Sequence, residues 1–546
     1  MPSKTCTPST KPTYPVNLPP PPWPAAAPSS STAAIWRWRK ASHPGQEDAT
    51  VAEQSETVTA VTDAGQIRGR VTADGILSFL GVPYAEPPVD PRRFEPPRRR
   101  KAFETPFEAG EYGPTAPQRR RQGPLAAIMP NVVRPGEDFL NLNIWTGALD
   151  GRRPVMVFIH GGCWTWGSGT DDGYNGSRFA RDGVVLVTIN YRLGFDGGFA
   201  WFGDGTPNLG LLDQISALEW VRDNIGAFGG DPHAVTVFGQ SAGALSIGAL
   251  LAMPRARGLF QRAIMQSGAT YHAIGPTSAR LVAHRLAAAV GVPPSREALS
   301  KVPLDELLEA QEQISADMAK NPNTRLWGDA AANGLAFEPI IDGDTLPVLP
   351  IHALQHGDSA DVDLLVGTNT EETMIAFAPS GVDHVQASML HPIARRAGLP
   401  PIRALEAYRA ERPAGRPVDH ATAILTDQTY RIPALRTAET HPRAYVYEFA
   451  WRSPGFDGQL GACHGAELPF VFDNLDSPDW KTLVGDAPPQ KLADRMHATW
   501  IRFARTGDPG WDRYDSGKRV VMIFDGNSRT VSDPRGITRA VWSGRQ

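Results

Sequence analysis

Short, continuously apolar segments separated by amphipathic ones dominate the chain from about residue 58 onward. The apolar segments are rich in β-branched and aromatic residues, which favours strands buried on both faces. Between them, Leu211, Ile215, Leu218 and Ile225 recur near the 3.6-residue spacing of a helix. The pattern predicts an α/β fold, with a mostly parallel twisted sheet covered by helices on both faces. The predicted strands are Val155–His160, Val184–Asn190, Ala234–Phe238, Val362–Val366, Tyr445–Phe449 and Val520–Phe524.

The remaining segments differ in character. Val58–Val61 and Gly65–Val71 alternate around a turn and predict an initial hairpin. Residues 270–360 and 375–440 are predicted as mostly helical insertions, and the stretch from about 105 to 136, rich in Pro, Gly and Arg, as a long functional loop or lid. Residues 1–55 are rich in Pro, Ala and Ser and predict a disordered tail. Residues 56–546 are predicted to form one domain.

Composition excludes several classes of protein. The 546 residues are 41% hydrophobic and 21% charged, with a net charge of -4, which is ordinary for a globular protein and does not indicate nucleic-acid binding. The basic runs Arg98–Lys101 and Arg119–Arg121 are interpreted as solvated loop faces. No apolar run reaches the ~18 residues of a membrane span, and prolines interrupt any secretion-signal core. Only Cys6, Cys163 and Cys463 are present, which predicts no disulfide framework and a reducing, cytoplasmic location.

Candidate chemistry begins at Gly239–Gly243, which has the pattern G-x-S-x-G. A predicted strand precedes this pattern and a predicted helix, Ala244–Leu251, follows it. A strand, a sharp turn and a helix form a nucleophile elbow, in which flanking glycines allow a strained turn that exposes the serine hydroxyl. Ser241 is therefore the candidate nucleophile.

A serine nucleophile needs a base, and the base needs an orienting acid, in the chain order Ser, acid, His. Among the histidines after Ser241, His464 lies between small residues in Gly461–Leu468, which would let its loop approach the serine closely. Glu371 and Glu372 follow a buried predicted strand, and the local sequence does not distinguish between them.

An oxyanion also needs backbone N–H donors. His160–Trp164 follows the strand Val155–Ile159 and supplies a Gly-Gly pair, and Ala242, directly after the nucleophile, supplies a further N–H group. No H-E-x-x-H or Cys-x-x-Cys pattern is present, so neither a metal nor another cofactor is predicted.

Together with further blocks, these residues resemble the type-B carboxylesterase family, over about Val58 to Tyr514. The matching blocks include Phe79–Pro88, Glu137–Asn143, His160–Trp164, Asn208–Gln214, Asn224–Pro232, Gln266–Gly268, His464–Leu468 and Phe503–Pro509. The resemblance implies an α/β-hydrolase fold for a catalytic domain over residues 56–546. It implies the triad Ser241, Glu372 and His464, with Glu372 preferred over Glu371. It also implies oxyanion donors at Gly162, Cys163 and Ala242, with a mainly conformational role for Gly161.

Two departures from the family pattern stand out. Phe139 replaces a cysteine that is usually disulfide-bonded, and Cys163 replaces the commoner Gly or Ala. A structural role is favoured over a redox role for Cys163 and Cys463. Trp164 and Trp166 either pack in the core or line an aromatic acyl pocket.

The expected function is hydrolysis of carboxylic esters through an acyl-enzyme intermediate, on small-molecule substrates that are hydrophobic or aryl esters, by a monomer or homodimer. A cholinesterase activity is not supported, because no cation-binding aromatic cage can be located. The alternatives are hydrolysis of a carbamate, lactone or specialised natural-product ester, and a non-catalytic adhesion or scaffold protein of the same fold.

Overall fold

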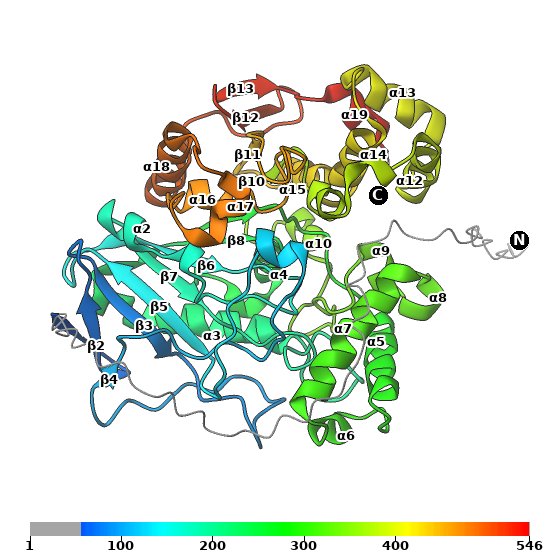
Figure 1. Cartoon of the computed structure of the whole chain (residues 1–546). Coiled ribbons are helices and arrows are strands. Elements are labelled where there is room, and N and C mark those ends of the chain that lie inside the picture. Colours follow the sequence, from blue (N-terminus) through cyan, green and yellow to red (C-terminus); the bar gives the residue numbers. More distant parts are fainter. Residues whose placement is uncertain (1–55, 545–546) are drawn as a thin grey trace, which may run out of the picture.

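The computed structural model describes residues 56–544, so the predicted tail of residues 1–55 and Cys6 lie outside the described residues. One sheet of thirteen strands runs through the molecule (Figure 1). Twelve strands follow one another across the sheet, and the short strand β4 (Phe107–Glu108) pairs with β2 beside this row. The spatial order of the twelve is β1 (Thr57–Thr62), β2 (Gly65–Val71), β3 (Leu77–Pro83), β5 (Asn141–Thr146), β7 (Val185–Ile189), β6 (Arg153–Ile159), β8 (Gly230–Gln240), β9 (Arg262–Gln266), β10 (Asp363–Asn369), β11 (Ala444–Phe449), β12 (Val520–Phe524) and β13 (Arg529–Ser532).

The centre of the sheet is parallel and its edges are antiparallel. Strands β7, β6, β8, β9, β10, β11 and β12 pair in parallel, whereas β1, β2, β3, β5 and β7 pair antiparallel, as do β12 and β13. Every residue of β7, β10 and β11 is buried, as expected for strands covered on both faces. The predicted α/β fold with a mostly parallel sheet is confirmed, and the carboxyl ends of the parallel strands meet along one edge.

Helices pack on the sheet in two groups. Helix α4 (Ala242–Ala252) packs on β8 and β9 and contacts α3 (Leu209–Asn224) and α10 (Pro350–Gln355). The other group consists of α2 (Ser177–Arg181), α16 (Leu468–Val471) and α18 (Gln490–Thr506). On that side Phe158 of β6 and Phe238 of β8 meet Phe472, with ring centroids 5.1 and 5.8 Å apart. Phe472 directly follows α16, so these aromatic contacts fix the position of α16, and the segment that leads into this helix carries His464.

The two predicted insertions are mostly helical. The first contains α5 (Pro276–Ala289), α6 (Arg296–Ser300), α7 (Leu304–Lys320), α8 (Thr324–Trp327), α9 (Ala330–Asn333) and α10. The second contains α11 (Met374–Phe377), α12 (Leu390–Arg396), α13 (Pro401–Glu411), α14 (Pro417–Thr426) and α15 (Ile432–Thr440), with a π-helical turn at Asp427–Arg431. The remaining helices are α1 (Pro124–Ile128), α17 (Lys481–Val484) and α19 (Gly536–Val541). None of the helices within residues 56–544 is long and apolar enough to cross a bilayer.

Several strands escaped the sequence analysis, and buried polar residues explain one of them. Asn143 of β5 accepts a hydrogen bond from Gly81 N at 2.8 Å and donates to Gly169 O at 3.0 Å. Because its amide satisfies neighbouring backbone groups, the polar side chain is tolerated in the core, yet it interrupts the apolar pattern of the strand. The helical spacing that begins at Leu211 corresponds to α3, which stops at Asn224, one residue before Ile225, and Ile225–Phe228 continues as a 3₁₀ helix.

Candidate active site

Ser241 occupies a strained turn between β8 and α4. Its backbone has φ 56° and ψ -124°, a conformation that non-glycine residues rarely adopt. The flanking glycines allow the close packing that holds this turn. A Cβ at Gly243 would lie 1.9 Å from the carbonyl oxygen of Ile159, and one at Gly239 would lie 2.7 Å from the same atom. The G-x-S-x-G sequence thus lets α4 start directly against the end of β6.

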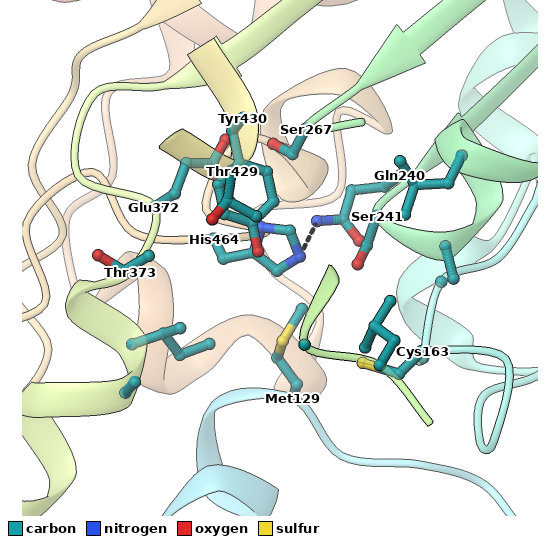
Figure 2. A pocket seen from close by; sticks show the side chains of 18 of the residues that line it. Met129, Cys163, Gln240, Ser241, Ser267, Glu372, Thr373, Thr429, Tyr430 and His464 are labelled. Atoms are coloured by element: carbon teal, nitrogen blue, oxygen red, sulfur yellow. Dashed lines mark hydrogen bonds and ion pairs between the residues drawn. The ribbon is translucent and has the colours of Figure 1, made fainter. Parts of the chain in front are cut away.

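His464 and Glu372 form a buried pair beside Ser241 (Figure 2). Nδ1–H of His464 donates to Glu372 Oε2 at 2.7 Å, and the backbone N–H of His464 donates to the carbonyl oxygen of Glu372 at 3.1 Å. The other carboxylate oxygen of Glu372 accepts from Asn369 N at 2.8 Å. Because Nδ1 carries the proton in this arrangement, Nε2 presents its lone pair to the cavity.

Glu371 points elsewhere. Its carboxylate forms an ion pair with Arg452 and accepts from Ala462 N at 2.9 Å. The two adjacent glutamates therefore have separate partners: Glu372 holds the His464 ring, whereas Glu371 holds the backbone just before it.

Gln240 was overlooked in the sequence analysis because it occupies a variable position of the G-x-S-x-G pattern. Its side-chain nitrogen Nε2 lies 3.0 Å from Nε2 of His464 (Figure 2). With the proton of His464 on Nδ1, the Gln240 amide donates this hydrogen bond. The lone pair of His464 Nε2 is therefore engaged by Gln240 in this structure.

The loop after β6 turns sharply at the predicted oxyanion donors. Gly162 has φ 108°, and a Cβ there would lie 1.9 Å from the carbonyl oxygen of Trp166, so only glycine fits. Cys163 follows with φ 54°. The backbone N–H groups of Gly162 and Cys163 donate to no group within residues 56–544. Both residues line the same cavity as Ser241 and Ala242.

His160, at the start of this loop, is buried and contacts the loop backbone. Its side chain is 1% exposed, its ring stacks on Tyr191 with centroids 4.4 Å apart, and its Nδ1 lies 2.8 Å from the carbonyl oxygen of Gly161. Burial lowers the pKa of His160 to about 4. His160 is therefore neutral at pH 7, and it donates from Nδ1 to the Gly161 carbonyl.

A cavity of about 340 Å³ connects these groups. Ser241, Glu372 and His464 contribute to its lining, together with Trp166. Apolar side chains from the 105–136 stretch and from the two insertions complete the lining: Leu125, Met129, Met318, Leu335, Ile375, Phe377 and Leu425. Figure 2 shows Met129 and Cys163 on the side of the cavity opposite Glu372. The predicted triad and oxyanion residues therefore all face one mostly apolar space.

Trp164 packs in the core and is not part of the aromatic acyl pocket that was considered for it. Its side chain is fully buried and does not line the cavity, because its indole N–H donates to Ser246 Oγ at 2.8 Å and its ring packs on Phe199. Of the two tryptophans considered, only Trp166 lines the cavity.

The two described cysteines are free thiols. Cys163 is half-buried and lines the cavity, whereas Cys463 is fully buried next to His464. Burial raises the pKa of both thiols. Within residues 56–544, no cluster of three or more His, Cys, Asp or Glu side chains could hold a metal ion.

Comparison with known proteins places this chain in a family. Residues 54–530 match the carboxylesterase family. The chain is 35% identical to the para-nitrobenzyl esterase of Bacillus subtilis (strain 168) over 499 residues, 88% of this chain and 97% of that protein. It is 37% identical to phenmedipham hydrolase of Pseudarthrobacter oxydans over 470 residues, 83% of this chain and 91% of that protein.

A solved structure supports the same family assignment. The carboxylesterase EST55 of Geobacillus stearothermophilus superposes with a TM-score of 0.76 at 35% identity, covering 89% of this chain and all of that one. The chain therefore belongs to the carboxylesterase family, has the α/β-hydrolase fold and is an ester hydrolase.

Proposed function

We propose that this esterase cleaves carboxylic esters with the triad Ser241, His464 and Glu372 through an acyl-enzyme intermediate. The observation that carries the proposal is the His464–Glu372 hydrogen bond at 2.7 Å, in a cavity shared with a serine on a strained elbow. The Glu372 carboxylate keeps the proton of His464 on Nδ1 and leaves Nε2 as the base.

The first step forms the acyl-enzyme. Nε2 of His464 exchanges the Gln240 amide for the Ser241 hydroxyl and takes its proton as Oγ attacks the ester carbonyl carbon. The resulting oxyanion accepts hydrogen bonds from the backbone N–H groups of Gly162, Cys163 and Ala242, each worth about 3–4 kcal/mol. The imidazolium, stabilised by Glu372, then protonates the leaving alcohol oxygen as its bond to the carbonyl carbon breaks.

The second step releases the acid. A water molecule gives its proton to Nε2 of His464 and attacks the acyl carbon, and the tetrahedral intermediate collapses with return of the proton to Ser241 Oγ. No other group needs to change protonation state.

The preferred substrates are hydrophobic or aryl esters. Aliphatic and aromatic side chains predominate around Ser241, with Trp166 and Tyr430 among them, and such a lining favours apolar acyl and alcohol groups. The name of one relative, para-nitrobenzyl esterase, accords with an ester that carries an aryl group. Retention of Ser241, Glu372 and His464 disfavours the alternative of a non-catalytic adhesion or scaffold protein.

Covalent labelling and substitution test the proposal together. A fluorophosphonate probe is expected to label Ser241 stoichiometrically and abolish hydrolysis of para-nitrophenyl butyrate. Ser241→Ala is expected to lower kcat by about 10⁴- to 10⁶-fold. Ser267→Ala provides the control, because Ser267 also lines the cavity but has no hydrogen-bond partner for its hydroxyl within the described chain. Near-normal turnover by Ser241→Ala would contradict the assignment.

A further inference from the structure

Arg121 departs from the solvated loop face predicted for the run Arg119–Arg121. Arg119 and Arg120 are exposed, and Arg119 pairs with Glu309 and Glu312 of α7 at 3.5 and 3.4 Å. Arg121, the third member of the run, instead turns inward and lines the cavity that contains Ser241. The sequence prediction is therefore wrong for this one residue.

The Arg121 guanidinium rests on an aromatic ring and forms no ion pair within residues 56–544. Its carbon Cζ lies 3.9 Å from the centroid of the Trp166 ring, a cation–π contact. Its Nη1 is buried and has no hydrogen-bond partner in the part of the chain that the structure describes. A buried nitrogen of this kind is costly unless some group accepts its hydrogen bond. One face of the guanidinium is therefore covered, while its Nη1 has no acceptor among the described residues.

The loop that carries Arg121 is anchored to the oxyanion loop. The backbone N–H of Arg121 donates to Asn131 Oδ1 at 2.9 Å, and the Asn131 amide donates to Gln118 Oε1 at 2.8 Å. Gln118 in turn donates to the carbonyl oxygen of Gly167 and accepts from Gly167 N, both at 2.8 Å. Gly167 directly follows Trp166. The position of Arg121 relative to the oxyanion loop is thus set by a chain of hydrogen bonds, of which all but the first are fully buried.

The carboxylates that line the same cavity are engaged elsewhere. Asp171 accepts from Val132 N and Ser168 Oγ, Asp479 accepts from Gly173 N, and Glu372 accepts from His464. None of them forms an ion pair with Arg121 within residues 56–544. Burial lowers the pKa of Arg121 to about 10, so the side chain keeps its positive charge at pH 7.

We propose that Arg121 and Trp166 form an anion subsite of the active site, and that the chain prefers esters that carry a free carboxylate besides the scissile ester bond. The inference rests on the proposed hydrolysis by Ser241. A planar guanidinium fork matches a carboxylate, with two parallel N–H···O bonds. The mostly apolar surroundings strengthen such a charge-assisted pair and suit a monoanion attached to an aliphatic or aryl group.

A second arginine serves as the competing candidate. Arg396 of α12 also lines the cavity with a buried Nη1 that has no partner in the described chain. Arg121 is preferred because it lies against Trp166, and because its charge is close enough to Cys163, a predicted oxyanion donor, to influence the pKa of that thiol.

The experiment compares charged and neutral esters of matched shape. In the acyl arm, mono-para-nitrophenyl glutarate is compared with para-nitrophenyl valerate; in the alcohol arm, para-acetoxybenzoate is compared with para-acetoxybenzamide. For each ester, kcat/KM is measured for the unmodified chain and for Arg121→Gln. In one of the two arms, Arg121→Gln is expected to lower kcat/KM of the carboxylate ester about 10- to 100-fold more than that of its neutral partner.

Three further variants make the test decisive. Arg120→Gln removes an exposed charge from the same run and should leave the ratio between charged and neutral esters unchanged. Arg121→Lys keeps the charge but loses the planar fork, so it should retain part of the preference. Arg396→Gln should leave the ratio unchanged. Melting temperature and fluorophosphonate labelling of Ser241 establish that each variant is folded.

The results that would contradict the anion subsite differ from those that would contradict the proposed function. If the neutral esters are cleaved but Arg121→Gln leaves the ratio unchanged in both arms, the anion subsite is wrong and the proposed function stands. The subsite is equally wrong if only Arg396→Gln alters the ratio, or if charged and neutral esters lose activity equally in Arg121→Gln. If the unmodified chain cleaves none of the four esters, the proposed function fails, and the subsite fails with it.

Discussion

The floor and the wall of the cavity are built in different ways. The floor consists of Gly162, Ser241, Glu372 and His464, which follow the parallel strands β6, β8, β10 and β11 in the chain. The wall consists of Arg121, Leu125, Met129 and Pro130, which lie in and around α1, and of side chains from the helical insertions. In the floor, the Glu372–His464 pair is fixed by backbone and side-chain hydrogen bonds. In the wall, apolar side chains predominate, and Nη1 of Arg121 has no hydrogen-bond partner in the described part of the chain.

From this difference we expect the floor to carry out the reaction and the wall to select the substrate. Groups held by the sheet edge cannot shift without disturbing the core, so they suit steps that need fixed geometry. Segments inserted between strands can vary without altering that edge. Floor substitutions should therefore reduce kcat for all esters, whereas wall substitutions should change the relative kcat/KM of different esters.

The largest expected effect in the floor after loss of the nucleophile is that of Glu372→Gln. The amide offers His464 a poorer partner and favours the wrong tautomer, so kcat should fall about 10³- to 10⁴-fold for every ester. Glu371→Gln is the matched control, because its carboxylate contacts Arg452 and Ala462 rather than His464. Its effect on kcat should stay below about tenfold. Equal losses in steady-state assays of the two variants would remove the distinction between these glutamates.

Gly162→Ala should lower kcat about 10²- to 10³-fold, the usual effect of losing one oxyanion donor. The added Cβ would lie 1.9 Å from the Trp166 carbonyl oxygen, so the loop must move and carry its N–H groups away. Gly75→Ala is the control: it also has a positive φ, 76°, but a Cβ there meets no atom within 4 Å. It should cost about 1 kcal/mol of stability and leave kcat unchanged. Unchanged kcat in Gly162→Ala would contradict the assigned oxyanion donors.

Acid should lower the unfolding free energy of the chain through His160, which lies just before the glycines of the floor loop. Its pKa is lowered to about 4 in the folded chain, against about 6.5 when unfolded, so the unfolded chain binds the extra proton first as the pH falls. The contribution of this neutral side chain is complete above about pH 6.5 and is lost as the pH falls to about 4, by up to about 3 kcal/mol.

Chemical denaturation at about pH 7 and about pH 5 would measure this loss of stability. His160→Phe should be less stable at pH 7, because it lacks the hydrogen bond to Gly161, but its unfolding free energy should fall less between the two pH values. An identical pH dependence in both chains would show that His160 does not titrate in this way.

The smallest expected effect belongs to the wall. Met129 projects toward the site, and its Cε would lie 2.6 Å from a Cβ at Gly465, next to His464 (Figure 2). Met129→Ala should shift the preferred acyl chain length, by about fourfold in kcat/KM for each methylene that gains or loses contact. Met389 does not line the cavity, so Met389→Ala should leave the preferred acyl chain length unchanged. If Met129→Ala instead lowered kcat/KM equally for all acyl chain lengths, Met129 would behave like a floor residue, and the distinction between floor and wall would be wrong.

Much of the floor could be predicted because its residues follow regular elements. Continuous apolar strands define the parallel sheet, and the strand, Gly-flanked turn and helix around Ser241 are local features. The order of nucleophile, acid and base along the chain follows from the order of the strands. The choice between Glu371 and Glu372 did not come from local sequence. It came from family resemblance, and in the structure the separate partners Arg452 and His464 distinguish the two residues.

The sequence by itself determined the fold class, the elbow serine and the segments that could supply its partners, because these depend on short-range periodicity and on glycines at sharp turns. Tertiary structure alone decided that Trp164 is buried against Ser246, that Gln240 contacts His464, and that Arg121 turns inward while Arg120 stays exposed. The physical reason is that side chains in irregular loops have no period. Their directions and partners depend on contacts with residues distant in the chain, which only folding brings together.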